Sequence, residues 1–292
     1  MLTRLLDVLS TWACHSSPRQ RQIFIKGVAG FLFGLYRLSR HREFIQKNIA
    51  GALPLNSQEQ THLARQHIEN LLDAILTLLR FPLFAHGTEP VPIQLEGYEH
   101  FLSAHQGGQG VILVSAHFGC WELFPAFLGQ AGYEIQVLVQ RPTVKAFDQY
   151  FNQSRAYAKV QTAYNDTISG LRPVLRALKK GQVLGLLIDQ HGESNQILGD
   201  FFGHHVSMPE GPYFLAQKTG ACIVPVFTYR ESETHLIQFF PALDLDQFSG
   251  PQELMQTLYH QIEAMIRQHP SEWLWSYNRW DKYQPCPRCL QA

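Results

Sequence analysis

The chain has 292 residues, of which 45% are hydrophobic, and a formal net charge of zero. This size and composition suit one globular domain without repeats or linkers, and the balanced charge gives no reason to expect nucleic-acid binding. The five scattered cysteines do not form a disulfide framework for a chain of this length, which fits a reducing compartment.

The N-terminal part of the chain is basic. Residues 1–50 contain eight Lys or Arg and two acids, whereas the remainder contains 16 basic and 22 acidic residues. Residues 23–38 are mostly apolar, but Lys26 and Arg37 leave an uninterrupted run shorter than the roughly 20 residues that span a bilayer. We therefore expect residues 1–45 to associate with an anionic membrane surface, and residues 46–292 to form the main domain. A solvated helix face is the alternative, and we see no secretory signal.

The middle and C-terminal parts of the chain alternate between short apolar runs, typical of buried strands, and longer amphipathic stretches, typical of helices. Residues 57–80 predict a long core helix capped by Ser57, with Gln60 three residues later. Further on, short apolar runs predict strands at residues 111–114, 134–140, 183–188, 222–229 and 235–240. Amphipathic stretches predict helices beginning near Trp121 and at residues 144–158, 168–180, 210–219 and 252–269. Such alternation predicts an α/β fold with a mostly parallel central sheet flanked by helices.

A histidine follows the first of these strands, and a glutamate follows the histidine. The carboxyl ends of strands in open α/β sheets are where ligands bind, so His117 is well placed for chemistry. Glu122 is expected in the first helical turn, where its carboxylate would fix the tautomer of His117 and leave the other imidazole nitrogen as a base. The commoner arrangement for an isolated pair of this spacing is a strand-end His bonded to backbone and a helix-capping Glu.

The sequence His117-Phe-Gly-Cys-Trp-Glu122 resembles the H-x4-[D/E] motif of the glycerolipid acyltransferase superfamily, most closely the H-F-G-x-W-E form of the bacterial lipid A late acyltransferases. The similarity extends from about residue 20 to about residue 283. Further matches occur in the same order along the chain: Arg141-Pro142, Asp189-Gln190, Phe201-Phe202-Gly203, Gly211, Thr219-Gly220-Ala221, Val224-Pro225, Trp273-Leu274-Trp275 and Arg279-Trp280.

The resemblance implies transfer of a fatty acyl group from an acyl-carrier protein or coenzyme A thioester to a hydroxyl of a lipid A precursor. The expected location is the cytoplasmic face of the cell inner membrane, and no cofactor or metal is needed. His117 would be the general base and Glu122 its orienting acid, while backbone amides near Gly119 would donate to the oxyanion.

Other residues are candidates for substrate binding. Arg141 ends a predicted strand, where its guanidinium could hold a phosphate or the phosphopantetheine of the donor. Asp189 ends another strand, where it could bind an acceptor, orient a basic residue or support the following loop. Gly119, Arg155 and Arg172 complete the expected substrate-binding set.

Residues 190–209 predict a long loop, which is often functional. Phe201 and Phe202 in this loop could wall an acyl-chain groove or lie in the core. The spacing of His191, His204 and His205 matches no metal site, and we expect none in the tail pair Cys286 and Cys289.

Three positions depart from the family pattern: Cys120 replaces the usual Asn, His191 a common Asp and Met208 the usual Thr. We expect these positions to lie on the substrate side, so they leave the acceptor open. The alternatives are a different glycolipid or amino-lipid acceptor, or a lipid-binding protein without turnover. A hydrolase with Cys120 as its nucleophile is a more distant alternative.

Overall fold

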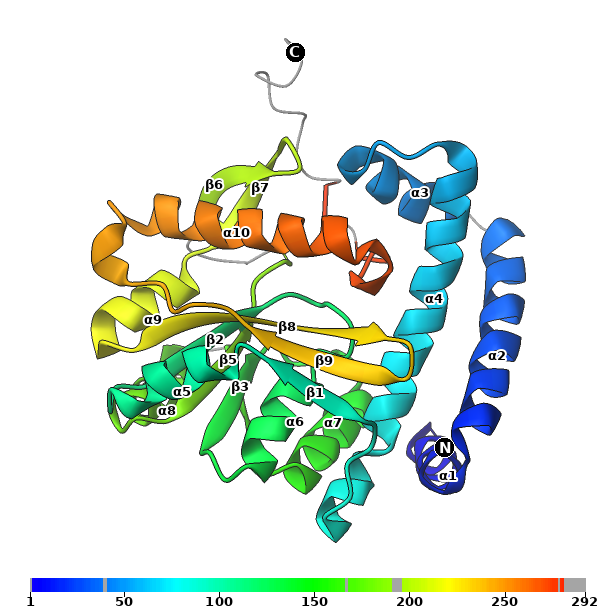
Figure 1. Ribbon diagram of the computed structural model, residues 1–292, viewed down its shortest axis with the longest axis horizontal. Helices are drawn as coiled ribbons and strands as arrows, with labels where there is room; N and C mark the ends of the chain where they lie inside the picture. Colours follow the sequence, from blue (N-terminus) through cyan, green and yellow to red (C-terminus); the bar gives the residue numbers. More distant parts are fainter. Residues whose placement is uncertain (1, 39–40, 166–167, 191–195, 278, 281–292) are drawn as a thin grey trace.

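The computed structural model describes the chain except for residues 1, 39–40, 166–167, 191–195, 278 and 281–292. Among the described residues, seven strands form the central sheet in the order β1-β9-β8-β2-β5-β3-β4 (Figure 1). Their bounds are β1 (Ile93–Glu96), β2 (Val111–Ser115), β3 (Ile135–Val139), β4 (Val160–Tyr164), β5 (Val183–Leu187), β8 (Cys222–Glu231) and β9 (Thr234–Phe239). Neighbouring strands are parallel except for the β8–β9 hairpin. The mostly parallel sheet that the sequence predicts is confirmed.

Helices cover both faces of this sheet. Their bounds are α5 (Tyr98–Gln106), α6 (Leu123–Gln130), α7 (Lys145–Tyr157), α8 (Ile168–Lys179), α9 (Gly211–Thr219) and α10 (Pro251–Gln268). The buried strand β2 shows the reason, because successive side chains point to opposite faces. Ile112 belongs to a core cluster with residues of α8, α9 and α10. Leu113 belongs to a second cluster with residues of α5 and α6. With both faces covered, β2 is apolar at successive positions rather than alternate ones.

A helical layer from the first 80 residues packs against one end of the domain. It consists of α1 (Leu2–His15), α2 (Pro18–Leu38), α3 (His41–Ala52) and α4 (Ser57–Leu79). Residues of α1, α2 and α4 share a small core that contains Ala13, Ile25 and Leu79. The predicted helix at 57–80 is confirmed, but its predicted cap is wrong. Asn56 is the cap, because its side-chain oxygen accepts hydrogen bonds from the backbone N–H groups of the first helical turn. The carboxylate of Glu59 in turn accepts a hydrogen bond from the backbone N–H of Asn56.

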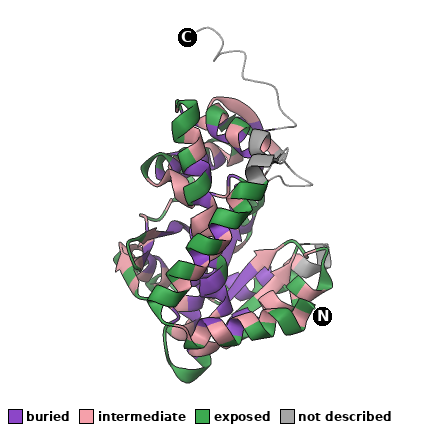
Figure 2. Cartoon of the chain, turned by 90° about the vertical axis from the view of Figure 1, so that its right-hand side faces the viewer, coloured by how far each residue is buried: buried purple, intermediate pink, exposed green. Residues whose placement is uncertain are grey.

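The outer surface of α1 and α2 is unusually apolar. Large hydrophobic side chains are exposed there: Leu2, Leu5, Val8, Ile23, Phe31, Leu32 and Leu35. Figure 2 views the domain from the side of these helices, where exposed residues alternate with half-buried ones. None of the described helices combines the length and the apolar character that crossing a membrane would require.

The predicted loop at 190–209 is wrong over most of its described part. β6 (Gln196–Phe201) and β7 (His204–Pro209) form an antiparallel hairpin that rests on α10. Gln256 of α10 exchanges two hydrogen bonds with the backbone of Asp200. Phe201 is fully buried, so it is a core residue rather than the wall of an open groove. The turn at Phe202 and Gly203 has positive φ at both residues and lacks the usual hairpin sequence, which is why the pattern was missed.

Candidate active site

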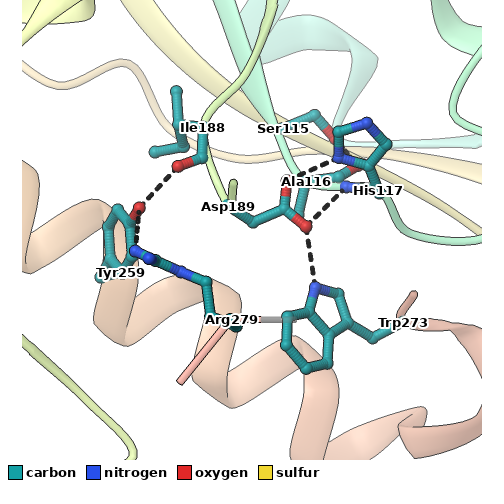
Figure 3. Close-up of polar contacts among 8 residues, drawn as sticks. All are labelled: Ser115, Ala116, His117, Ile188, Asp189, Tyr259, Trp273 and Arg279. Atoms are coloured by element: carbon teal, nitrogen blue, oxygen red, sulfur yellow. Dashed lines mark hydrogen bonds and ion pairs between the residues drawn. The ribbon is translucent and has the colours of Figure 1, made fainter. Parts of the chain in front are cut away.

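The candidate site begins where β2 and β5 end side by side. These strands are parallel and in register, with Ser115 opposite Leu187, so His117 and Asp189 follow at equal distances. Their side chains meet: Nδ1 of His117 lies 2.8 Å from Oδ1 of Asp189. The backbone N–H of His117 also donates to Oδ2 of Asp189 at 3.0 Å, and the indole N–H of Trp273 donates to the same oxygen at 2.8 Å (Figure 3).

This contact favours the ionised form of Asp189 and one tautomer of His117. Asp189 is only 2% exposed. Burial acts to raise the pKa of its carboxyl, but His117 and the donated hydrogen bonds outweigh burial and lower the pKa below its usual value. The ionised carboxylate favours the proton on Nδ1 of His117, and we assign that tautomer. Nε2 is then the basic nitrogen, and it points away from Asp189 (Figure 3).

The expected pairing of Glu122 with His117 is wrong. Glu122 instead accepts two hydrogen bonds from Arg155 of α7, at 3.0 Å from Nε and 2.6 Å from Nη2. Both side chains are about 10% exposed. Burial acts to lower the pKa of Arg155, but Glu122 more than compensates and raises it. Glu122 immediately precedes the first residue of α6, and its carboxylate is directed towards α7. The ring of His117 instead packs edge-on against the ring of Trp121.

Gly119 has a structural reason to be glycine. Its φ is +56°, and a β-carbon there would collide with the carbonyl oxygen of Thr228. Its backbone N–H donates to the carbonyl oxygen of Glu272 at 2.9 Å. The N–H of Gly119 itself is therefore already used, while the expectation that backbone amides near Gly119 donate to the oxyanion stays a prediction.

A pocket of about 570 Å³ opens beside His117. Its polar part contains His117, Glu122, Arg141 and Arg155. Its apolar lining comes from β3, β5 and α6 and includes Phe124, Val137, Val139, Gly185 and Leu187. A pocket that combines the His117 imidazole with this apolar lining suits a substrate that carries a hydrocarbon chain.

The three arginines expected to bind substrate differ in position. Arg141 lines the pocket at its rim, where it pairs with Asp148 at 3.2 Å and lies 3.6 Å from the centre of the Tyr164 ring. Arg155 also lines the pocket, but Glu122 occupies two of its nitrogens. Arg172 is exposed on α8, outside the described residues that line the pocket.

Two of the three departures from the family pattern, Cys120 and Met208, do not lie on the substrate side, where we expected them. Cys120 is buried, and burial raises the pKa of its thiol well above the usual value. A thiol in that state is a poor nucleophile, which argues against the hydrolase. Met208 is also fully buried, in the core cluster beside α10. His191, Cys286 and Cys289 lie outside the described residues.

Sequence reasoning missed the contact of Asp189 with His117 and the place of Trp273 in the site. Asp189 is among the predicted site residues, with orientation of a basic residue as one of its expected roles, but Glu122 was the predicted partner of His117. The signal that could have joined them is that each residue comes shortly after a buried parallel strand. Trp273 belonged to a motif match without a role, and no local signal connects it to Asp189, which lies 84 residues earlier.

Comparison with known proteins gives the site a context. The family model described as bacterial lipid A biosynthesis acyltransferase matches residues 5–282. A phosphatidylinositol mannoside acyltransferase from Mycolicibacterium smegmatis is 25% identical over 206 residues, which cover 69% of this chain and 66% of that protein. A lipid A biosynthesis acyltransferase from Haemophilus influenzae is 20% identical over 264 residues, covering 86% and 79%.

The match to the mycobacterial proteins is partial, since this chain spans 66% of the length of one and 58% of another, from Mycobacterium tuberculosis. Among solved structures, a 1-acyl-sn-glycerophosphate acyltransferase from Thermotoga maritima aligns over 88% of this chain and 99% of its own. The TM-score is 0.41 and the sequence identity is 12%.

Proposed function

Because the chain belongs to the bacterial lipid A biosynthesis acyltransferase family, we propose that it transfers a fatty acyl group from a thioester to a hydroxyl of a lipid. The observation that carries this proposal is the His117–Asp189 pair beside a pocket with an apolar interior. A positioned base and space for a hydrocarbon chain are the two features that such a transfer needs.

In the proposed reaction, Nε2 of His117 accepts the proton of the acceptor hydroxyl while the hydroxyl oxygen attacks the thioester carbonyl carbon. The carbon–sulfur bond then breaks, and the imidazolium returns the proton to the departing thiolate. The buried carboxylate of Asp189 stabilises the imidazolium between these steps. Glu122 holds Arg155 in the pocket wall and has no direct part in proton transfer.

The donor would be an acyl-carrier protein or coenzyme A thioester. Both carry phosphopantetheine, and Arg141 at the rim of the pocket has the planar guanidinium suited to a phosphate. The hydrocarbon chain would enter the apolar part of the pocket between β3, β5 and α6.

The acceptor would be a lipid A precursor. A different glycolipid is the second candidate, because relatives named phosphatidylinositol mannoside acyltransferases match this chain. An amino lipid is the third candidate acceptor. A lipid-binding protein without turnover would need neither an ionised Asp189 nor an oriented His117.

The place of action would be the cytoplasmic face of the inner membrane. The exposed apolar side chains of α1 and α2 support association with a bilayer, and the exposed basic residues Arg4, Arg19 and Lys26 on the same helices support an anionic surface. The side chains of Arg37, Arg40 and Arg42 lie outside the described residues.

The experiment that tests the transfer incubates purified protein with acyl-carrier protein or coenzyme A thioesters and with each candidate lipid, and detects the acylated product by mass spectrometry. We expect wild-type protein to add one acyl chain. His117→Ala should reduce the rate by about 10²- to 10⁴-fold, the usual contribution of a positioned base. Lipid binding without any acylated product would support the non-catalytic alternative instead.

Membrane association has its own test, which is sedimentation with vesicles containing anionic lipid. Replacing Arg4, Arg19 and Lys26 by Gln should weaken binding, since each basic residue near such a surface contributes about 1 kcal/mol. The matched control replaces three exposed basic residues in and just after the last turn of α8, namely Arg176, Lys179 and Lys180. An equal loss of binding in both variants would contradict the proposed surface.

A further inference from the structure

A short segment near the C-terminal end of the described chain runs alongside the turn that carries His117. The backbone N–H of Leu274 donates to the carbonyl oxygen of His117 at 3.1 Å, and the N–H of Gly119 donates to the carbonyl oxygen of Glu272 at 2.9 Å. Between these bonds, Phe118 and Trp273 form an antiparallel bridge. The His117 turn is therefore held by backbone bonds from a segment about 155 residues later in the chain.

The side chain of Trp273 reaches the same site from this segment. It is 1% exposed, and its indole N–H lies 2.8 Å from Oδ2 of Asp189. The backbone N–H of His117 donates to that oxygen as well, while the other oxygen faces Nδ1 of His117 (Figure 3). Three donors thus fix both oxygens of Asp189, and the carboxylate cannot rotate without breaking one of them.

We propose that Trp273 is a positioning residue for acyl transfer, which acts through Asp189 to hold the His117 ring with Nε2 directed at the acceptor hydroxyl. The inference rests on the proposed function. The indole N–H also takes up part of the carboxylate charge, so Asp189 is a weaker acceptor for His117 than it would be without Trp273. Trp273 therefore sets both the orientation of the base and its basicity.

Trp275 provides a matched control. It is fully buried, its ring centre lies 4.8 Å from that of Trp273, and its indole N–H also donates a hydrogen bond. The acceptor of that bond is the carbonyl oxygen of Pro270, at 2.6 Å, rather than Asp189. Replacing either tryptophan by Phe removes one indole N–H and leaves a smaller buried ring. Only the replacement of Trp273 removes a hydrogen bond to the His117–Asp189 pair.

The test compares Trp273→Phe with Trp275→Phe in steady-state assays across pH, with thermal unfolding measured for both. We expect Trp273→Phe to lower kcat by about tenfold, because a hydrogen bond to a charged group is lost, with little change in KM. The acid limb of kcat/KM should move to higher pH by about half a unit, because Asp189 then stabilises the imidazolium more strongly. Trp275→Phe should leave kcat and the pH profile close to wild type.

Neighbouring groups that titrate need a control. His67 donates to the backbone of Trp273, but burial lowers its pKa to about 4, below the range of the assay. Burial raises the pKa of Glu272 to about 7, within that range. The profile is therefore measured also with Glu272→Gln, in which the shift caused by Trp273→Phe should persist.

Equal kcat and equal pH profiles in the two Phe variants would overturn the inference. If Trp273→Phe does not fold, the ¹⁵N indole signals of a Trp121→Phe protein are followed across pH instead, because the ring of Trp121 also lies near the pair, against His117. One indole N–H signal should then shift with pH, at the same midpoint as the acid limb of kcat/KM. If no indole signal shifts at that midpoint, the inference is overturned. Full activity of His117→Ala would instead refute the proposed function itself.

Discussion

Asp189 and Glu122 are both buried acids near the His117 turn, yet they have different partners. Asp189 follows β5 and accepts hydrogen bonds from His117 and Trp273. Glu122 precedes α6, only five residues after His117, and it is paired with Arg155. The acid that is near in sequence pairs with Arg155 in the pocket wall, whereas the acid 72 residues away contacts the imidazole of His117. Adjacency of parallel strand ends, rather than sequence spacing, decides which acid reaches the imidazole.

The largest effect should follow from removing the charge of Asp189. We expect Asp189→Asn to lower kcat by about 10³- to 10⁴-fold, as loss of the orienting carboxylate does in serine-protease triads. The fold should persist, because the amide fills the same space. Glu122→Gln should lower kcat of the folded protein far less. A larger loss of kcat in Glu122→Gln than in Asp189→Asn would contradict the proposal that Asp189, rather than Glu122, orients His117.

The next effect concerns stability. Glu122→Gln leaves the buried Arg155 without its counter-charge, so we expect a loss of about 3–5 kcal/mol in the free energy of unfolding. Denaturant titration of the purified protein measures this loss. The double replacement Glu122→Leu with Arg155→Met should lose less than the single one, because no buried charge remains. A single variant as stable as wild type would show that the pair is not structural.

The half-buried acid Glu272 shows the opposite pKa shift to Asp189. Burial raises the pKa of Glu272 to about 7, although Arg230 opposes it. A raised pKa favours the folded state at low pH, and this contribution is lost as pH rises through 7. The stability that Asp189 contributes is present above pH 4 and lost only below it.

The unfolding free energy of Glu272→Gln should therefore vary less with pH than that of wild type. Between pH 5 and 7.5 we expect wild type to lose up to about 2 kcal/mol relative to the variant, since one pKa unit corresponds to about 1.4 kcal/mol. Parallel denaturant titrations at several pH values test this. A constant difference between the two proteins would mean that Glu272 is not the titrating group.

The smallest effect belongs to the rim of the pocket. Arg141→Ala should raise KM for one substrate by roughly three- to tenfold, and Arg141→Lys should recover part of it, because an ammonium keeps the charge without the planar fork. Replacement of the exposed Arg172, outside the described residues that line the pocket, is the control and should leave both KM values unchanged. If KM is unchanged for both substrates in Arg141→Ala, the rim residue does not bind substrate.

The parts of the fold that sequence could predict are those governed by local pattern. The apolar strand β2 and the amphipathic helix α10 are recognisable because burial on both faces or on one face leaves a periodic signal. The edge strands β1 and β4 were missed, since they are partly exposed and carry polar residues.

The site was predictable in place but not in its contacts. His117 and Arg141 lie near the pocket as expected, because each follows a strand. The partner of His117 depends on β5 lying next to β2, and strand order is not written in local spacing. Trp273 depends on the path of the chain after α10, which no local pattern determines.

The most direct test of the central claim is the tautomer of His117, read from imidazole ¹⁵N signals. Among the 14 histidines, those of His117 are identified by their loss in His117→Ala. We predict a proton on Nδ1 in wild type and in Glu122→Gln, and loss of this preference in Asp189→Asn. A tautomer that changes in Glu122→Gln but persists in Asp189→Asn would contradict it.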